Sequence, residues 1–142
     1  MTYSGKSHAR MRIMLTALLL SALGVATAFA ADIKVTLSGA NEVPPVTTSA
    51  SGGGTITVGD DGSLSGSVST NGVAGTAAHI HVGAAGANGP VIVPMTKEGD
   101  SYNLPAGAKL TEAQMASFKA GDLYVNVHSA ANPNGEIRGQ LK

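Results

Sequence analysis

Apolar and polar residues alternate along several short segments of this chain, which is the pattern of β-strands with one buried face. In residues 32–37, for example, Ile33, Val35 and Leu37 alternate with polar residues. The same pattern predicts further strands at 55–58, 63–69, 76–82, 91–94, 123–128 and 136–141.

Turn-forming residues separate these segments. The sequence Gly-Asp-Asp-Gly at 59–62 predicts a hairpin turn, and the Gly/Ala-rich residues 83–90 predict a loop. Residues 41–45 include two adjacent prolines, which cannot lie in a central strand, so an extended loop is expected there. Residues 47–54 are small and polar, and we expect a flexible segment.

One helix is predicted near the C-terminal end. Thr111 has the character of an N-cap, and Gln114 lies three residues later, where a capping box requires it. Leu110 and Met115 take the positions of a hydrophobic staple, and Gly121 is expected to end the helix. Short strands with one inserted helix predict an all-β fold, an antiparallel Greek-key β-sandwich in a single domain.

The N-terminal segment has the pattern of a secretory signal peptide. Three basic residues precede an apolar run at 13–29, which ends in the small-residue cleavage pattern of 28–30. We therefore expect a signal peptide at 1–30, a β-sandwich domain at 31–142 and a periplasmic or secreted location without membrane attachment. A retained membrane helix is the alternative, and Met11 is an alternative start to Met1.

Composition narrows the classes of function. Residues 31–142 keep six basic and nine acidic residues, a formal charge of −3, and no basic stripe that would indicate a nucleic-acid partner. The absence of cysteine excludes disulfides, thiolate metal sites and a blue-copper centre. No nucleophile elbow, phosphate-binding loop, dinucleotide motif or EF-hand occurs.

Three histidines form the only constellation with evident chemistry. His79 and His81 share one face of a predicted strand, and His128 shares a face of another with Tyr124 and Asn126. If these strands are neighbours, three imidazoles converge in a set that suits Cu²⁺ or Zn²⁺. The Irving–Williams order and an export compartment poor in competing thiols favour copper. Alternatively, the histidines lie on polar faces and bind only loop backbone.

Five further residues are candidates for a fourth ligand or for orienting the ligands. Glu42 offers a carboxylate from a proline-stiffened loop, although it can equally pair with Arg138. Met95 offers a thioether to Cu⁺, with core packing as the simpler expectation. Tyr124 and Asn126 can fix an imidazole tautomer. Arg138 can guide anions to a metal, or form a surface charge pair with Glu136, two residues before it.

Three ordered motifs resemble the CHRD domain, a family named after the animal protein chordin and found alone in many exported bacterial proteins. They are the Leu-Ser-Gly-Ala-Asn-Glu-Val-Pro-Pro-Val segment at 37–46, the His-Ile-His-Val-Gly segment at 79–83 with 88–91, and 121–129 continuing into 132–141. The resemblance spans residues 33–141. It implies a β-rich extracytoplasmic domain and says little about activity.

The chain is also similar, more weakly, to copper/zinc superoxide dismutases. Those enzymes place a His-x-His pair on a strand of a Greek-key sandwich and add a copper ligand from a later strand, as His79, His81 and His128 would do here. Arg138 is loosely similar to their anion-guiding arginine. This chain lacks a bridging histidine, a zinc cluster and a cysteine pair.

Three functions are compatible with these observations. The first is a protein that binds one metal ion and holds or delivers it in the cell envelope. The second is an enzyme, a mononuclear copper superoxide dismutase in which Arg138 steers the anion. The third is a metal-free module that binds another cell-envelope protein or polymer.

Overall fold

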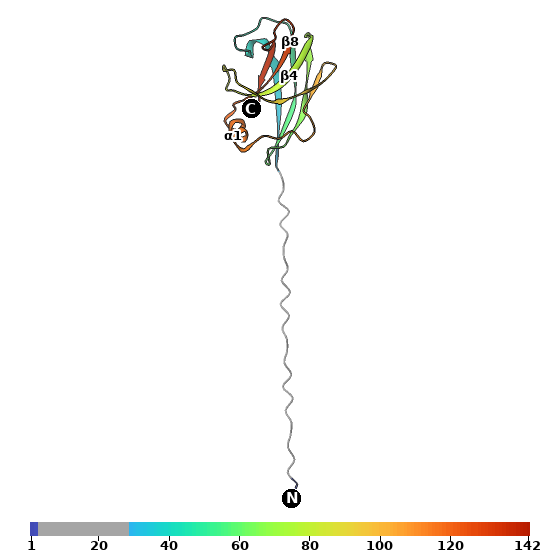
Figure 1. Cartoon of the computed structure of the whole chain (residues 1–142), viewed down its shortest axis with the longest axis vertical. Coiled ribbons are helices and arrows are strands. Elements are labelled where there is room, and N and C mark those ends of the chain that lie inside the picture. Colours follow the sequence, from blue (N-terminus) through green and yellow to red (C-terminus); the bar gives the residue numbers. More distant parts are fainter. Residues whose placement is uncertain (3–28) are drawn as a thin grey trace.

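The computed structural model describes residues 1–2 and 29–142, and in this part the chain is an antiparallel, nearly closed sheet with one α-helix (Figure 1). The helix is α1 (Glu112–Ala120), and a short 3₁₀ helix η1 (Gly39–Asn41) follows the first strand. The strands are β1 (Ala30–Ser38), β2 (Ser51–Gly59), β3 (Leu64–Asn71), β4 (Gly75–Val82), β5 (Val91–Pro94), β6 (Thr96–Glu98), β7 (Ser101–Asn103), β8 (Leu123–Ser129) and β9 (Ile137–Gln140).

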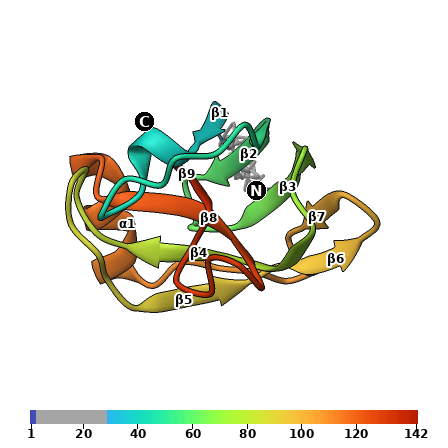
Figure 2. The same cartoon turned by 90° about the horizontal axis from the view of Figure 1, so that it is seen from above.

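The strand order confirms the predicted fold class. Strands follow one another in the order β5-β4-β8-β9-β1-β2-β3-β7-β6. The last strand, β9, pairs antiparallel with both β8 and β1, so strands from opposite ends of the chain are neighbours in the sheet. Strands β1 to β3 lie on one side of the molecule and β4 and β5 on the other, so the sheet folds into a sandwich (Figure 2).

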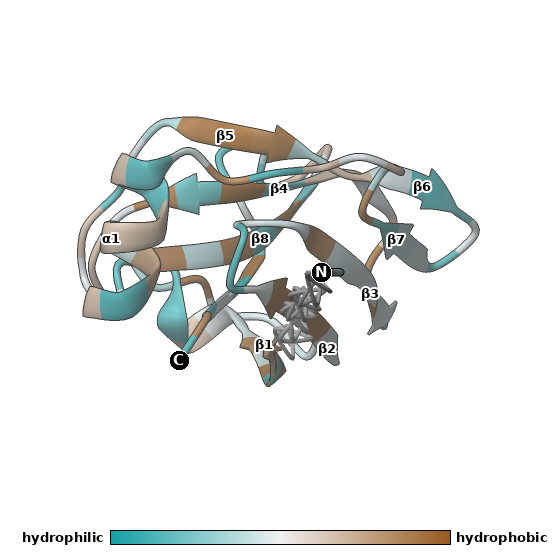
Figure 3. Cartoon of the chain, turned by 90° about the horizontal axis from the view of Figure 1, so that it is seen from below, coloured by the Kyte–Doolittle hydropathy of each residue, from teal (hydrophilic) through white to brown (hydrophobic). Residues whose placement is uncertain are grey.

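The alternation read from the sequence builds the apolar core between the two sides. Val35 and Leu37 of β1, Ile56 of β2, Ile80 of β4 and Val125 of β8 are all buried there. Hydropathy colouring shows the apolar residues along β4, β5 and β8, whereas β6 is hydrophilic (Figure 3). Strand β8 is buried along almost its whole length, so the face that points away from the apolar core is covered as well.

Helix α1 forms as the sequence predicts. Thr111 Oγ1 accepts a hydrogen bond from the Gln114 backbone N–H at 3.2 Å, and Gln114 Oε1 accepts one from the Thr111 backbone N–H at 2.9 Å. Gly121 ends the helix in a left-handed conformation with φ +79°. Leu110 is buried and Met115 packs against the core, where a hydrophobic staple places them.

One expectation about the strands is wrong, and one hairpin was not predicted. Residues 51–54 were expected in a flexible segment but belong to β2, where they pair with β1 on one side and β3 on the other. A Cβ at Gly54 would lie 2.0 Å from the backbone oxygen of Ser67, so the small residues allow close approach of the strands. The β6–β7 hairpin was not predicted because its strands are three residues long and mostly polar.

The predicted signal peptide falls almost entirely on residues 3–28, outside the described part of the chain. Strand β1 begins at Ala30, next to the predicted cleavage position. Within residues 1–2 and 29–142, no helix has the length and hydropathy needed to cross a membrane.

The capping box generates a test of the helix. Replacing Thr111 with alanine leaves the Gln114 backbone N–H without its acceptor, so we expect the free energy of unfolding to fall by about 1 kcal/mol. Denaturant unfolding followed by circular dichroism measures this change. Thr111→Ser keeps the hydroxyl and should retain most of the stability; equal losses in both variants would contradict the capping role.

Candidate metal centre

The pairing of β4 with β8 brings the three histidines to one face of the sheet. In this antiparallel register His79 lies opposite Asn126, and His81 lies opposite Tyr124. His128 lies opposite Ala77, two residues before His79 on β4. Ile80, between the two histidines of β4, points to the apolar core, so the imidazoles occupy the other face. Figure 1 shows β4 and β8 side by side.

The three imidazoles are close enough together to hold a metal ion. One potential ligand atom from each of the three residues lies within 4.8 Å of the others. His79 Nδ1 and His128 Nε2 are 3.0 Å apart and share a hydrogen bond, so a metal ion bound by both would replace the proton between them. Two nitrogens bonded to one ion at about 2.0–2.1 Å are separated by roughly 3 Å, so this pair already has a suitable spacing. The other nitrogens are up to 4.8 Å apart, so the rings would have to move closer together to bind one ion.

Loop carbonyls determine which nitrogen of two rings is free. His81 Nδ1 donates to the Gly89 carbonyl and His128 Nδ1 donates to the Pro133 carbonyl, both at 2.9 Å. A neutral imidazole has one N–H, so Nε2 keeps its lone pair; His81 Nε2 has no partner, whereas His128 Nε2 bonds to His79 Nδ1. The expectation that the histidines bind loop backbone is therefore met by His81 and His128 but not by His79, which bonds to His128, and the backbone bonds fix the orientation of two of the rings.

Three buried acceptor atoms at this site have no hydrogen-bond partner in the protein. They are His81 Nε2, Asn126 Oδ1 and Glu42 Oε1, from side chains that are 7%, 2% and 4% exposed. Leaving a buried acceptor unpaired costs about 1–3 kcal/mol, so native proteins rarely collect several in one place. All three are acceptors, and a cation is the kind of partner that such a group attracts.

Glu42 lies beside Asn126 although it comes from a distant loop. Glu42 Oε1 and Asn126 Nδ2 lie 2.4 and 2.5 Å from the position that a Cβ on Gly135 would occupy. Gly135 has φ +129°, a conformation that favours glycine, and its missing side chain leaves room for both groups. Burial raises the pKa of Glu42, opposed by the Arg138 charge and the Asn126 amide.

Tyr124 lies between His81 and Arg138. Its ring stacks on the His81 imidazole with centroids 4.7 Å apart, and the Arg138 Cζ is 3.4 Å from the centroid of the same ring. Because β4 and β9 flank β8 on opposite sides, the two groups approach the ring from different strands. The Tyr124 hydroxyl also accepts a hydrogen bond from the Gly89 backbone N–H at 3.1 Å. Tyr124 therefore supports the ring and the loop that orient His81.

The expected surface pair of Glu136 and Arg138 is wrong. Arg138 is 1% exposed and donates to the Ala84 carbonyl at 2.9 Å and to Gln140 Oε1 at 3.0 Å. Glu136 is also buried and accepts hydrogen bonds from Thr48 and Ser129. Loops from distant parts of the chain cover both side chains, which the pattern of one strand cannot reveal. Arg138 is also too deeply covered to meet anions at the surface.

Met95 is not part of the histidine cluster. Its side chain packs in the apolar core with Ala78 and Ile80, on the face of β4 opposite the imidazoles. Of the five residues that the sequence nominated around the histidines, the structure gathers four near them: Glu42, Tyr124, Asn126 and Arg138. The sequence also gave no sign of the two carbonyls, of Gly89 and Pro133, that orient the rings.

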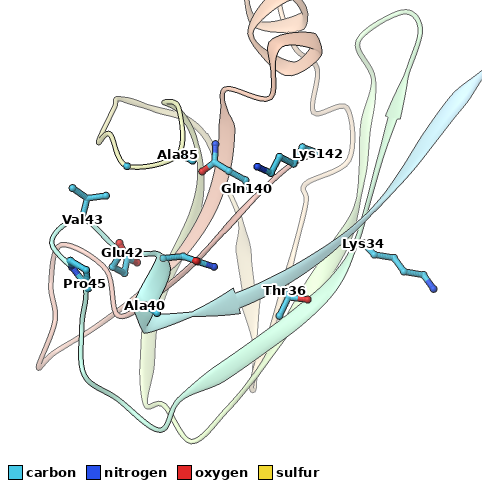
Figure 4. Close-up of a pocket in the computed structure, with 11 residues that line it drawn as sticks. Lys34, Thr36, Ala40, Glu42, Val43, Pro45, Ala85, Gln140 and Lys142 are labelled. Carbon is cyan, nitrogen blue, oxygen red and sulfur yellow. The ribbon is translucent and has the colours of Figure 1, made fainter.

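Two clefts lie on either side of the loop that carries Glu42. The larger, about 650 Å³, is lined by Glu42, Gln140 and the lysines at 34 and 142, among others (Figure 4). The smaller, about 460 Å³, lies between the proline-rich segment 42–47 and residues 131–135. The histidines line neither cleft, so the imidazole cluster is separate from both.

Burial also sets the protonation of the imidazoles. It lowers the pKa of His79, and the neighbouring His128 and His81 lower it further. Burial is likewise the largest influence on His81 and lowers its pKa, while the hydrogen bond to Gly89 opposes the change. Both rings are therefore neutral near pH 7, the state in which imidazole binds metals.

The fold and the cluster define an antiparallel β-sandwich domain with three convergent imidazoles on an outer face. The CHRD domain family matches residues 33–141, and the chain belongs to this family. CHRD domains occur in extracellular proteins. No curated protein and no solved structure significantly matches the chain.

The lowered histidine pKa values predict how the stability of the metal-free protein depends on pH. Unfolded histidines bind protons near pH 6.5, whereas folded His79 and His81 do so only at lower pH. The free energy of unfolding should therefore fall as pH drops from about 6.5 through the folded pKa values. Denaturant unfolding with chelator present measures it. The double variant His79→Gln/His81→Gln should flatten this part of the profile; an unchanged slope would contradict the assignment.

Gly135 provides a second test. Gly135→Ala adds a Cβ that meets Glu42 and Asn126, and it also strains a positive φ, so we expect a loss above about 1 kcal/mol. Gly86→Ala is the matched control, because Gly86 has φ +81° but no atom within 4 Å of the added Cβ. Denaturant unfolding of both variants measures the difference. Equal losses would show that the close approach to Glu42 and Asn126 contributes nothing.

Proposed function

We propose that this protein binds one transition-metal ion through His79, His81 and His128. The observation that carries the proposal is the convergence of three imidazole nitrogens within 4.8 Å, and His81 Nε2 is in addition buried and unpartnered. Both nitrogens of a buried histidine usually have a hydrogen-bond partner in the protein. Here the lone pair of His81 Nε2 has none, and the nearby Asn126 Oδ1 and Glu42 Oε1 are unpartnered acceptors as well.

The donor set favours copper. Three neutral imidazoles suit both Cu²⁺ and Zn²⁺, and copper binds such sites more tightly in the Irving–Williams order. The chain has no cysteine, so it cannot offer the thiolate ligands that are typical of structural zinc sites. Since CHRD domains occur in extracellular proteins, the role we propose is to hold or deliver copper outside the cytoplasm. The buried position of Arg138 lends no support to the dismutase alternative.

A metal titration tests the proposal. Calorimetry of the purified metal-free protein with Cu²⁺ and with Zn²⁺ should show one ion bound per chain, more tightly for Cu²⁺. An ion present at 100 times its dissociation constant should raise the free energy of unfolding by about 2.7 kcal/mol. His79→Ala, His81→Ala and His128→Ala should each weaken binding at least about tenfold, because each removes one ligand.

Thr96→Ala serves as the control, since Thr96 is exposed in β6 and should leave binding unchanged. Circular dichroism verifies that the histidine variants remain folded. Saturable binding that survives in all three histidine variants, or no saturable binding at all, would contradict the proposal and leave the metal-free interaction module as the function to test.

A further inference from the structure

Asn126 lies at the centre of the face that carries the imidazoles. It is directly opposite His79 in the β4–β8 pairing and two residues from His128 on its own strand. His81, opposite Tyr124, is its diagonal neighbour. Opposed residues of an antiparallel pair have Cβ atoms about 5 Å apart, and residues i and i+2 on a strand about 6–7 Å apart. All three imidazoles are therefore within reach of the Asn126 side chain.

The surroundings of Asn126 determine how its amide is turned. Its Nδ2 donates to the Asn134 carbonyl at 3.3 Å, and the Glu42 carboxylate lies on the same side. Both of these groups accept hydrogen bonds, so they require the NH₂ edge of the amide. The Oδ1 edge is consequently turned the other way, toward its diagonal neighbour His81, where Asn126 favours the protonated form of the ring and so opposes the lowering of its pKa.

This orientation places two lone pairs together without a hydrogen between them. Asn126 Oδ1 and His81 Nε2 are both buried and unpartnered. Neutral His81 cannot donate from Nε2, because its one N–H is at Nδ1 and is bonded to Gly89. A metal cation between the two atoms satisfies both at once, as would a proton on His81 Nε2, but burial disfavours the protonated ring.

Resting on the proposed function, we propose that Asn126 Oδ1 is the fourth ligand, so that the site is a three-nitrogen, one-oxygen centre selective for divalent ions over Cu⁺. An amide oxygen is a hard donor that suits Cu²⁺ and Zn²⁺, whereas Cu⁺ prefers a thioether, and Met95 packs in the core away from the imidazoles. A divalent ion carries one more positive charge than Cu⁺. The buried carboxylate of Glu42, on the far side of the Asn126 NH₂ group, would offset this additional charge.

Two variants of Asn126 test this assignment. Asn126→Ala removes the oxygen and should weaken Cu²⁺ and Zn²⁺ binding about tenfold or more, while the affinity for Cu⁺, measured by chelator competition under a reductant, stays within about threefold. Asn126→Asp restores an oxygen with a negative charge and should retain or strengthen Cu²⁺ binding. Electron paramagnetic resonance of bound Cu²⁺ should change in both variants, because the donor atom is lost or becomes anionic.

Tyr102→Phe is the matched control. The Tyr102 hydroxyl is the other buried, unpartnered side-chain atom in the described residues, but it lies in the apolar core. Its removal should leave the affinities for Cu²⁺ and Cu⁺ and the copper spectrum unchanged.

The outcomes separate this inference from the proposed function. If the wild-type protein binds no metal, both fail. If the wild type binds metal through the histidines but Asn126→Ala keeps the wild-type Cu²⁺ affinity and spectrum, only the inference fails, and solvent is the fourth ligand. If Asn126→Ala does not fold, Asn126→Asp decides, because a copper spectrum identical to that of the wild type excludes ligation through Oδ1.

Discussion

The register of β4 against β8 is the constraint on which the candidate site depends. Side chains alternate between the two faces of a strand, so a slip of one residue would turn His79 and His81 into the apolar core and Ile80 out of it. The burial of Ile80 and Val125 between the layers opposes such a slip. The same apolar packing that stabilises the sandwich therefore also brings the imidazoles of two separate strands to one place.

The outer face of β4, β8 and β9 is a polar layer covered by loops rather than an open surface. Carbonyls of Gly89 and Pro133 orient two of the imidazoles, and the loop after η1 inserts Glu42 beside Asn126. This layer holds buried acceptors without donors, which reduces the stability of the fold. Proteins retain such groups chiefly where they serve a function, and a bound cation would recover the lost interaction energy.

Charge in this layer is balanced within the protein. The Arg138 guanidinium lies against Tyr124 on the side of β9, and the Glu42 carboxylate lies near Asn126, so a buried positive and a buried negative group lie close to the imidazoles, while a second buried carboxylate, Glu136, is held by Thr48 and Ser129. Neither Arg138 nor Glu42 has a surface ion-pair partner.

The sequence by itself determined the features that arise from local periodicity and capping. Alternation located most of the strands, Thr111 and Gln114 located the helix, and the spacing of His79 and His81 placed both on one face. Only the tertiary structure decided which strands are neighbours, that 51–54 is a central strand segment, and that Glu42 and Arg138 are buried. These properties depend on contacts between residues far apart in the chain, and a local pattern carries no information about which distant loop will cover a side chain.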